Sequence, residues 1–167
     1  MARRTLTPEP LTAGAFEAFG DVIETRGHQG LPINDGQALR FHDLAAIDVL
    51  AEEGRVLLNI FRARPGPAPI RVRMMERHPL SSQAFVPLAA TPFLILVAPP
   101  GANVAPAALR LFKSDGRQGV NYHRGVWHHP LLALERDAEF LVVDRGGPGT
   151  NCDVWEIDEA DEVTLRS

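Results

Sequence analysis

Residues 70–88, IRVRMMERHPLSSQAFVPL, contain two segments of β-strand character separated by a polar turn. In the first segment, residues 70–78 of a strand predicted over 69–78, alternate side chains point to opposite faces. One face begins with aliphatic side chains and ends with Glu76 and His78, whereas the other face carries three arginines. We therefore predict a strand with one solvent-facing and one inward-facing side, followed by a second strand over residues 83–88.

Short apolar segments separated by turns continue along the whole chain. Fourteen prolines and fourteen glycines interrupt the sequence, a rhythm typical of an all-β sandwich or barrel. No apolar segment of helical length lies between consecutive strands, which argues against parallel βαβ units. Further strands are predicted over residues 21–25, 38–43, 56–63, 93–98, 108–113, 129–134, 138–145 and 152–157.

Turn and cap residues add three local expectations. The Asp115-Gly116 pair predicts a hairpin-type turn between the strand ending at Lys113 and the segment that begins at Gly119. Thr12 is suited to cap a short helix that ends at Gly20. A second short helix is predicted over residues 47–54. The fold class is therefore mainly β, with one or two short helices.

Composition limits the class of protein. A chain of 167 residues suits one domain, residues 1–167, with a sizeable core. The net charge of −4 lacks the basic footprint of a nucleic-acid binder. The longest apolar run, residues 93–98, is too short to cross a bilayer, and residues 1–11 contain no apolar signal sequence. A single cysteine, Cys152, permits neither an internal disulfide nor a cysteine-based zinc site. We expect a soluble cytoplasmic protein that binds neither nucleic acid nor membranes.

A second histidine-bearing segment complements the first. Three of the six histidines lie within residues 119–134, GVNYHRGVWHHPLLAL. By alternation one member of the His128-His129 pair points inward, and a turn at Gly125 favours His128. An inward-facing Glu76 is costly to bury unless it has a partner, a proton or a metal. The alternative is a strand end that simply leaves the core and becomes polar.

These spacings resemble the two motifs of the cupins, in which His-x-His is followed by Glu and a later Gly-x-x-His supplies a fourth ligand. Glu76, His78 and Gln83 stand where the first motif has His, His and Glu, and His128 matches the second motif. The resemblance implies a double-stranded β-helix barrel. It also implies a divalent metal site, because the four side chain types can all bind such an ion.

A narrower resemblance covers residues 16–157. FGDVIET, ERHPLSSQAFVPL, GVNYHRGVWHHPLLAL and DRGGPGTNCDVWEI occur in that order, and the set is similar to the ureidoglycolate lyase family. Ser81-Ser82 departs from the Gly-Thr expected there, which changes the freedom of the turn. The resemblance implies cleavage of (S)-ureidoglycolate to glyoxylate and urea in allantoin and purine degradation. It also implies a homodimer and a dependence on nickel.

That reaction requires a general base and a general acid. The substrate carbon carries a carboxylate, a hydroxyl and a urea nitrogen, so the hydroxyl must lose a proton while the urea gains one. Either Glu76 or His128 is suited to take the hydroxyl proton. Either His78 or His123 is suited to protonate the urea.

Other residues are candidates for substrate binding. Arg145 lies beside glycines at a strand end and suits a carboxylate, with Lys113 and Arg124 as alternatives. The amides of Gln83 and Asn121 offer donors and acceptors to the ureido group.

Two further alternatives concern Trp127 and the reaction itself. Trp127 is a candidate pocket wall, although tryptophan more often packs in a core or an interface. A hydrolase would release ammonia, but it needs an activated water and usually a metal pair. A non-enzymatic cupin would bind a small carboxylic acid without turnover. Clustered titratable groups on an inner face argue mildly against that last reading.

Overall fold

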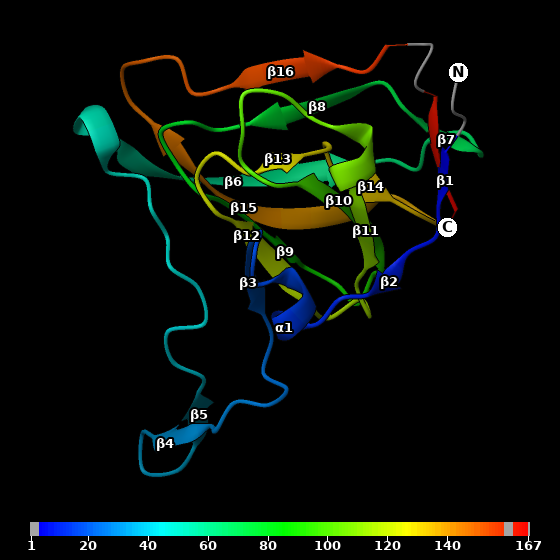
Figure 1. The fold of residues 1–167 in the computed structure, drawn as a ribbon. Coiled ribbons are helices and arrows are strands. Elements are labelled where there is room, and N and C mark those ends of the chain that lie inside the picture. The colour runs from blue at the N-terminus through cyan, green and yellow to red at the C-terminus, as the bar shows by residue number, and fades with distance from the viewer. Residues whose placement is uncertain (1–3, 159–161, 167) are drawn as a thin grey trace.

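The computed structural model describes residues 4–158 and 162–166, and within them the chain is mainly β with one short α-helix (Figure 1). Residues 1–3 of the N-terminal segment discussed above, and residues 159–161 and 167, lie outside this description. The mainly β prediction is confirmed. The described strands do not form a closed barrel; they are divided among four sheets.

Two large sheets make up most of the structure. The seven-stranded sheet has the order β16 (Asp153–Glu156), β8 (Met74–Arg77), β13 (Trp127–His128), β10 (Phe93–Ala98), β11 (Arg110–Lys113) and β2 (Glu9–Pro10), and β14 (Leu132–Ala133) also pairs with β10. The five-stranded sheet has the order β3 (Gly20–Ile23), β12 (Gly119–Tyr122), β9 (Gln83–Pro87), β15 (Ala138–Gly146) and β6 (Arg55–Ala63).

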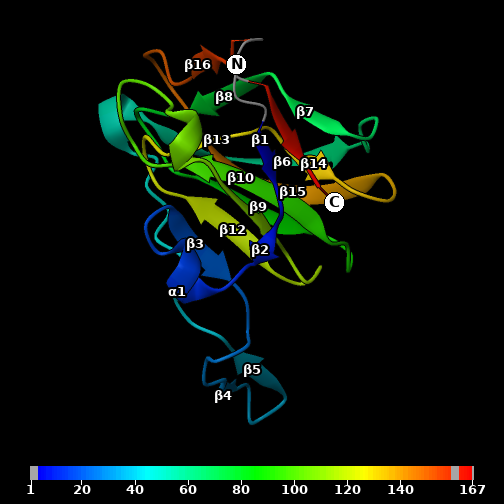
Figure 2. The ribbon, with the colours of Figure 1, turned by 45° about the vertical axis from the view of Figure 1, so that its right-hand side comes forward.

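Two smaller sheets complete the fold. The three-stranded sheet has the order β1 (Arg4–Leu6), β17 (Val163–Leu165) and β7 (Ile70–Val72). β4 (Leu31–Ile33) and β5 (Ala38–Arg40) form a hairpin that projects from the rest of the molecule in both ribbon views (Figures 1 and 2).

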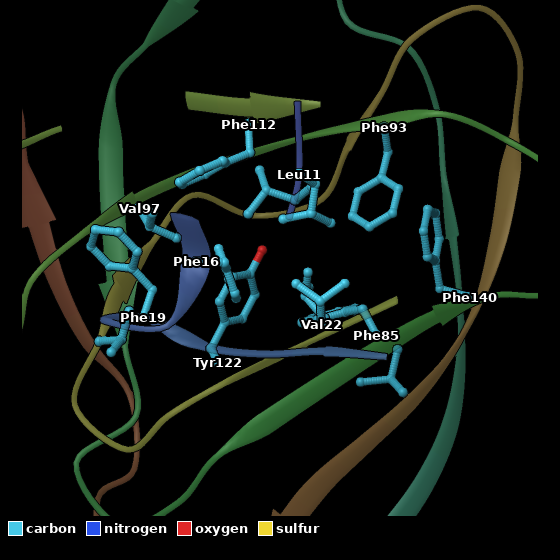
Figure 3. Close-up of a cluster of buried hydrophobic side chains, with 14 of the residues drawn as sticks. Leu11, Phe16, Phe19, Val22, Phe85, Phe93, Val97, Phe112, Tyr122 and Phe140 are labelled. Carbon is cyan, nitrogen blue, oxygen red and sulfur yellow. The ribbon is translucent and has the colours of Figure 1, made fainter. Parts of the chain in front are cut away.

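The central strand β10 shows why the chain forms layers. Phe93, Ile95 and Val97 belong to the hydrophobic cluster between the two large sheets, the main core (Figure 3). The alternate residues of the strand belong to a second cluster shared with the three-stranded sheet. Both faces of β10 are therefore buried, which accounts for its uninterrupted apolar sequence.

The predicted strand over residues 69–78 is divided in two at Arg73. β7 pairs with β17, whereas β8 pairs with β13 and β16 in a different sheet. The change of sheet resets the alternation of faces, so Met75, predicted to face solvent, is fully buried. Glu76 and His78 still share a side of the chain because the break precedes both of them.

The predicted Asp115-Gly116 hairpin is wrong, although a turn does form there. Gly116 has a φ of 93°, which favours glycine. The turn joins β11 to β12, which belong to different large sheets and do not pair with each other. A local turn signal does not determine which strands pair across it.

The helical predictions hold in part. α1 (Ala13–Phe16) begins after Thr12, whose Oγ1 accepts a hydrogen bond from the Ala15 amide. The helix ends before Gly20, which already begins β3. In the second predicted segment only a 3-10 turn forms, η1 (Ala51–Glu53), and another such turn, η2 (Pro106–Ala108), precedes β11. None of the helices in the described part of the chain has the length and apolar character needed to cross a membrane.

Candidate active site

Glu76, His78 and His128 converge around the paired strands β8 and β13 of the seven-stranded sheet. Glu76 and His128 are direct partners across the antiparallel pair β8–β13, and His78 follows the end of β8. One ligand atom from each of the three side chains lies within 4.8 Å of the others. The ring centroids of His78 and His128 are 5.2 Å apart. The two histidine-bearing segments of the sequence therefore meet in one cluster, which we call the Glu-His-His cluster.

The turn at Gly125 helps to bring these segments together. Gly125 has a φ of 76°, a conformation that glycine adopts without strain. Its amide donates a hydrogen bond to the backbone carbonyl of His78, with an N–O distance of 3.0 Å. The glycine thus joins the loop before β13 directly to the end of β8.

The His78 ring is held from both sides. Its Nδ1 lies 2.6 Å from the backbone carbonyl oxygen of Asn151, and its Nε2 lies 3.0 Å from Oε1 of the buried Gln83. Both partners are carbonyl oxygens, which can only accept, so each contact is a hydrogen bond when the facing ring nitrogen carries a hydrogen. In the neutral ring with its hydrogen on Nδ1, the site of the shorter contact, Nε2 has the free lone pair.

Asn151 was not among the residues selected from the sequence. Its side chain accepts a hydrogen bond from the Leu80 amide at 2.8 Å and donates to the Ser81 hydroxyl at 2.8 Å. These bonds tie the loop after His78 to the segment before β16. The four-stretch resemblance contains Asn151 within DRGGPGTNCDVWEI, but only tertiary structure reveals its contacts.

His128 is buried, with 1% of its surface exposed. Its ring stacks on Tyr122 at a centroid distance of 4.3 Å and an interplanar angle of 4°. Nδ1 lies 3.9 Å from Oε1 of Glu76, and Nε2 is buried without a hydrogen-bond partner among the described residues. Burial, with a smaller effect of His78, lowers the pKa of His128 to about 3. The imidazole is therefore neutral near pH 7, the form that binds metal ions.

The pKa of Glu76 shifts in the opposite direction. Burial disfavours its charged form and raises the pKa of the carboxyl, and the nearby His78 opposes this shift. A carboxyl whose pKa lies closer to neutrality is a better proton acceptor for catalysis near pH 7. The cluster thus combines a proton-accepting carboxyl with two imidazoles.

The donor set fits a divalent metal. The three ligand types suit ions such as zinc, nickel, copper or iron. A His78 Nδ1–H bonded to a backbone carbonyl is the arrangement commonly seen around metal-binding histidines. Nε2 of His128 has no hydrogen-bond partner among the described residues, so it is a further nitrogen available to bind a metal. Gln83 lies next to this set, with its oxygen directed at His78.

Arg145 is engaged elsewhere. Its buried guanidinium donates hydrogen bonds to the backbone carbonyls of Ala51, Glu52 and Pro148. It therefore holds the η1 turn in place, and the predicted role as a carboxylate anchor is not supported by this geometry.

Lys113 and Trp127 also lie away from the cluster. Lys113 lines a surface pocket of about 370 Å³ together with Arg26 and Asp115. Trp127 packs in the second hydrophobic cluster, and its Nε1 donates to the Gly101 carbonyl at 3.0 Å. Because Trp127 precedes His128 on β13, it occupies the opposite face of that strand and does not wall the cluster.

Asn121 and His123 form a separate polar group around Asp21. The Asp21 carboxylate accepts hydrogen bonds from Asn121 at 2.9 Å and from the Ala46 amide at 3.1 Å, and Nε2 of His123 lies 3.2 Å from it. Burial alone raises the pKa of Asp21, but these hydrogen bonds outweigh it and lower the pKa. Asn121 precedes Tyr122 on β12 and so faces away from the Glu-His-His cluster, and His123, just after the strand, is turned to Asp21.

Comparisons with known proteins cover nearly the whole chain. The family model described as ureidoglycolate lyase matches residues 3–164. A protein of Pseudomonas putida named ureidoglycolate lyase is 56% identical over 163 residues, which cover 98% of each chain. Proteins of the same name from Stutzerimonas stutzeri and Azotobacter vinelandii are 53% and 54% identical, and the matches cover 97% and 98% of this chain and 95% and 98% of theirs.

Proposed function

The chain belongs to the ureidoglycolate lyase family, and we propose that it cleaves (S)-ureidoglycolate to glyoxylate and urea at the Glu-His-His cluster. The observation that carries this assignment is the meeting of Glu76 with two imidazoles, one of them oriented by a backbone carbonyl. In this proposal, residues 1–167 form one domain of a soluble cytoplasmic enzyme that recovers nitrogen from purines through allantoin.

The reaction is an elimination in which no water is added. The hydroxyl proton leaves, the carbon–oxygen bond becomes the carbonyl of glyoxylate, and the carbon–nitrogen bond breaks. The departing urea nitrogen takes up one proton. The enzyme therefore needs one group that accepts a proton and another that donates one.

We assign the base to Glu76 and the acid to His78. Glu76 has the raised pKa that a base working near neutral pH requires. The bond from Nδ1 to the Asn151 carbonyl fixes His78 so that Nε2 exchanges the proton. His123, just after β12, is paired with Asp21 and is not used in this scheme. Gln83 directs its oxygen at His78, which leaves its amide nitrogen to donate to the ureido carbonyl.

The same three side chains, Glu76, His78 and His128, would hold a divalent metal, which we propose to be nickel. Nε2 of His78 would then be a ligand without a proton to donate, so Glu76 would pass the hydroxyl proton on to the departing urea nitrogen. When bound there, such an ion would supply positive charge that makes the substrate hydroxyl more acidic. His128 contributes a neutral imidazole with a free nitrogen.

A turnover assay tests the proposed function. We expect the purified protein to release urea and glyoxylate one-for-one from (S)-ureidoglycolate, without ammonia. We expect chelation to show which role His78 has: if turnover is lost and one added divalent metal restores it, His78 is a ligand, and if turnover persists, His78 is the acid. Ammonia in place of urea would instead assign a hydrolase, and binding of glyoxylate without turnover would assign a non-enzymatic binder. Full activity after complete metal removal would overturn the metal part of the proposal.

The outer face of the five-stranded sheet supports the proposed homodimer. Leu58 and Ile60 on the edge strand β6 are 68% and 61% exposed. They pair in register with Val143 and Leu141 of β15, so that these four apolar residues share the face turned away from the main core. A nine-residue edge strand with an apolar outer face is a site for association unless something covers it.

The projecting β4–β5 hairpin provides a second reason for a partner. Leu31, Ile33 and Leu39 on this hairpin are exposed, and an isolated two-stranded hairpin is only marginally stable in water. We propose that a second copy of the chain covers both surfaces.

Introducing negative charge into the proposed dimer interface tests whether it forms. We expect a Leu58→Asp, Ile60→Asp double variant to have half the parental mass in light scattering, because a carboxylate is costly to bury in an apolar contact. Val154→Asp, at an exposed apolar position on β16, is the matched control and should keep the parental mass. A parent protein that is itself monomeric at micromolar concentration would contradict the dimer.

A further inference from the structure

One face of the Tyr122 ring contacts the imidazole of His128 in the Glu-His-His cluster. The Tyr122 and His128 rings are nearly parallel, at 4° and 4.3 Å, and both residues are buried. No hydrogen bond holds Nε2 of His128 among the described residues, and Nδ1 has only long polar contacts, at 3.4 Å to the His129 carbonyl and 3.9 Å to Oε1 of Glu76. The ring plane of His128 is therefore defined mainly by what packs against its faces.

The Tyr122 ring is itself fixed by the main core. Its centroid lies 5.8 Å from that of Phe85 and 6.2 Å from that of Phe16. Figure 3 shows Tyr122 projecting from the backbone into this group of aromatic side chains. Movement of the phenol ring would require the main core to rearrange, so the ring is a rigid surface for His128 to rest on.

One strand pair supports both imidazoles of the cluster. Tyr122 on β12 is the register partner of Gln83 on β9. Tyr122 stacks on His128, and Gln83 contacts Nε2 of His78. The β9–β12 pair thus sets the relative orientation of the two rings, which come from the other large sheet and its following loop.

We infer that Tyr122 is a positioning residue, whose ring face fixes the plane of His128, and that its hydroxyl group is not required for this role. This inference rests on the proposed function for its effect on turnover, but not for its effect on ring geometry. Misplacement of a catalytic group by about 1 Å can reduce a rate about 10²-fold.

The test compares Tyr122→Phe with Tyr122→Leu. The phenylalanine variant keeps the stack, so we expect kcat close to the parental value. The leucine variant loses the stack, and we expect kcat to fall about 10²-fold while KM changes little, because the proposed role acts through His128 and not through contact with the substrate. Phe140→Leu removes an aromatic ring from the same core without touching His128, and it controls for loss of packing.

Nuclear magnetic resonance of the free protein provides a readout that does not depend on turnover. Stacking on an aromatic face should shift the carbon-bound ring protons of His128 upfield in the parent, in Tyr122→Phe and in Phe140→Leu. These signals should move to ordinary positions in Tyr122→Leu. Unchanged His128 signals in Tyr122→Leu, or a Tyr122→Phe variant as inactive as Tyr122→Leu, would overturn the inference. A parent without lyase activity would refute the proposed function and leave the ring-geometry test intact.

Discussion

Glu76→Gln is expected to lower kcat for ureidoglycolate cleavage by about 10²–10⁴-fold, the usual contribution of a general base. The amide keeps the size and shape of the side chain but does not accept the hydroxyl proton. Because burial of the Glu76 carboxylate is unfavourable, the same substitution should not reduce stability. Loss of activity without loss of stability is the combination expected of a residue retained for chemistry.

The sign of the stability effect follows from the raised pKa of Glu76. Folding favours the protonated carboxyl, so this group lowers stability as pH rises through its unfolded pKa and up to its higher folded value. The Gln variant lacks that dependence. Its melting temperature at pH 7–8 should therefore equal or exceed that of the parent, measured after chelation so that metal binding does not contribute.

A matched control shows whether the effect is specific to Glu76 or follows from the loss of any nearby carboxylate. Glu156 lies on the neighbouring strand β16 and is exposed, so Glu156→Gln should leave both kcat and melting temperature near the parental values. If Glu76→Gln retained turnover within a few-fold of the parent, Glu76 would not be the base, and the proton would have to go to another group.

Local rules were enough to predict which side chains form the Glu-His-His cluster. Alternation placed Glu76 and His78 together because both follow the break at Arg73, and the Gly125 turn pointed to His128. These predictions depended on only a few neighbouring residues each. Tertiary structure was needed only to show that the two segments meet across β8 and β13.

The predicted substrate-binding residues depended on contacts that local sequence does not contain. Arg145 has the right charge at the right kind of loop, but its partners lie up to 94 residues away in the η1 turn. Asn121 and His123 were chosen by type, whereas the structure turns both side chains to Asp21, away from the cluster. Adjacent residues of β13 face opposite sides, so Trp127 points away from the side on which His128 joins the cluster.

The fold was predicted at the level of strands but not of sheets. Most apolar segments do form strands close to their predicted bounds. The predicted strand divides between two sheets at Arg73, and the chain passes from one large sheet to the other at Gly116. Both changes depend on which strands are available to pair, and those strands come from distant parts of the chain. Hydrophobic periodicity reports burial, and it carries little information about partners.

His128→Gln is expected to change how stability depends on pH more than any other single substitution considered. Burial lowers the pKa of His128 to about 3, so the unfolded chain binds a proton more readily than the folded protein does. The parent should therefore lose stability as pH falls below about 6.5, the ordinary histidine pKa, and the loss should continue toward the folded pKa. One such group contributes a slope of about 1.4 kcal/mol per pH unit.

Denaturant unfolding of the chelated protein at pH 7, 6 and 5 measures this slope directly. The free energy of unfolding of His128→Gln should fall less steeply than that of the parent, by up to about 1.4 kcal/mol per pH unit. His42 is exposed, so His42→Gln should keep the parental slope and controls for the loss of one histidine. Equal slopes in the parent and in His128→Gln would mean that His128 accepts a proton inside the folded protein. It would then be a competitor of His78 for the role of general acid.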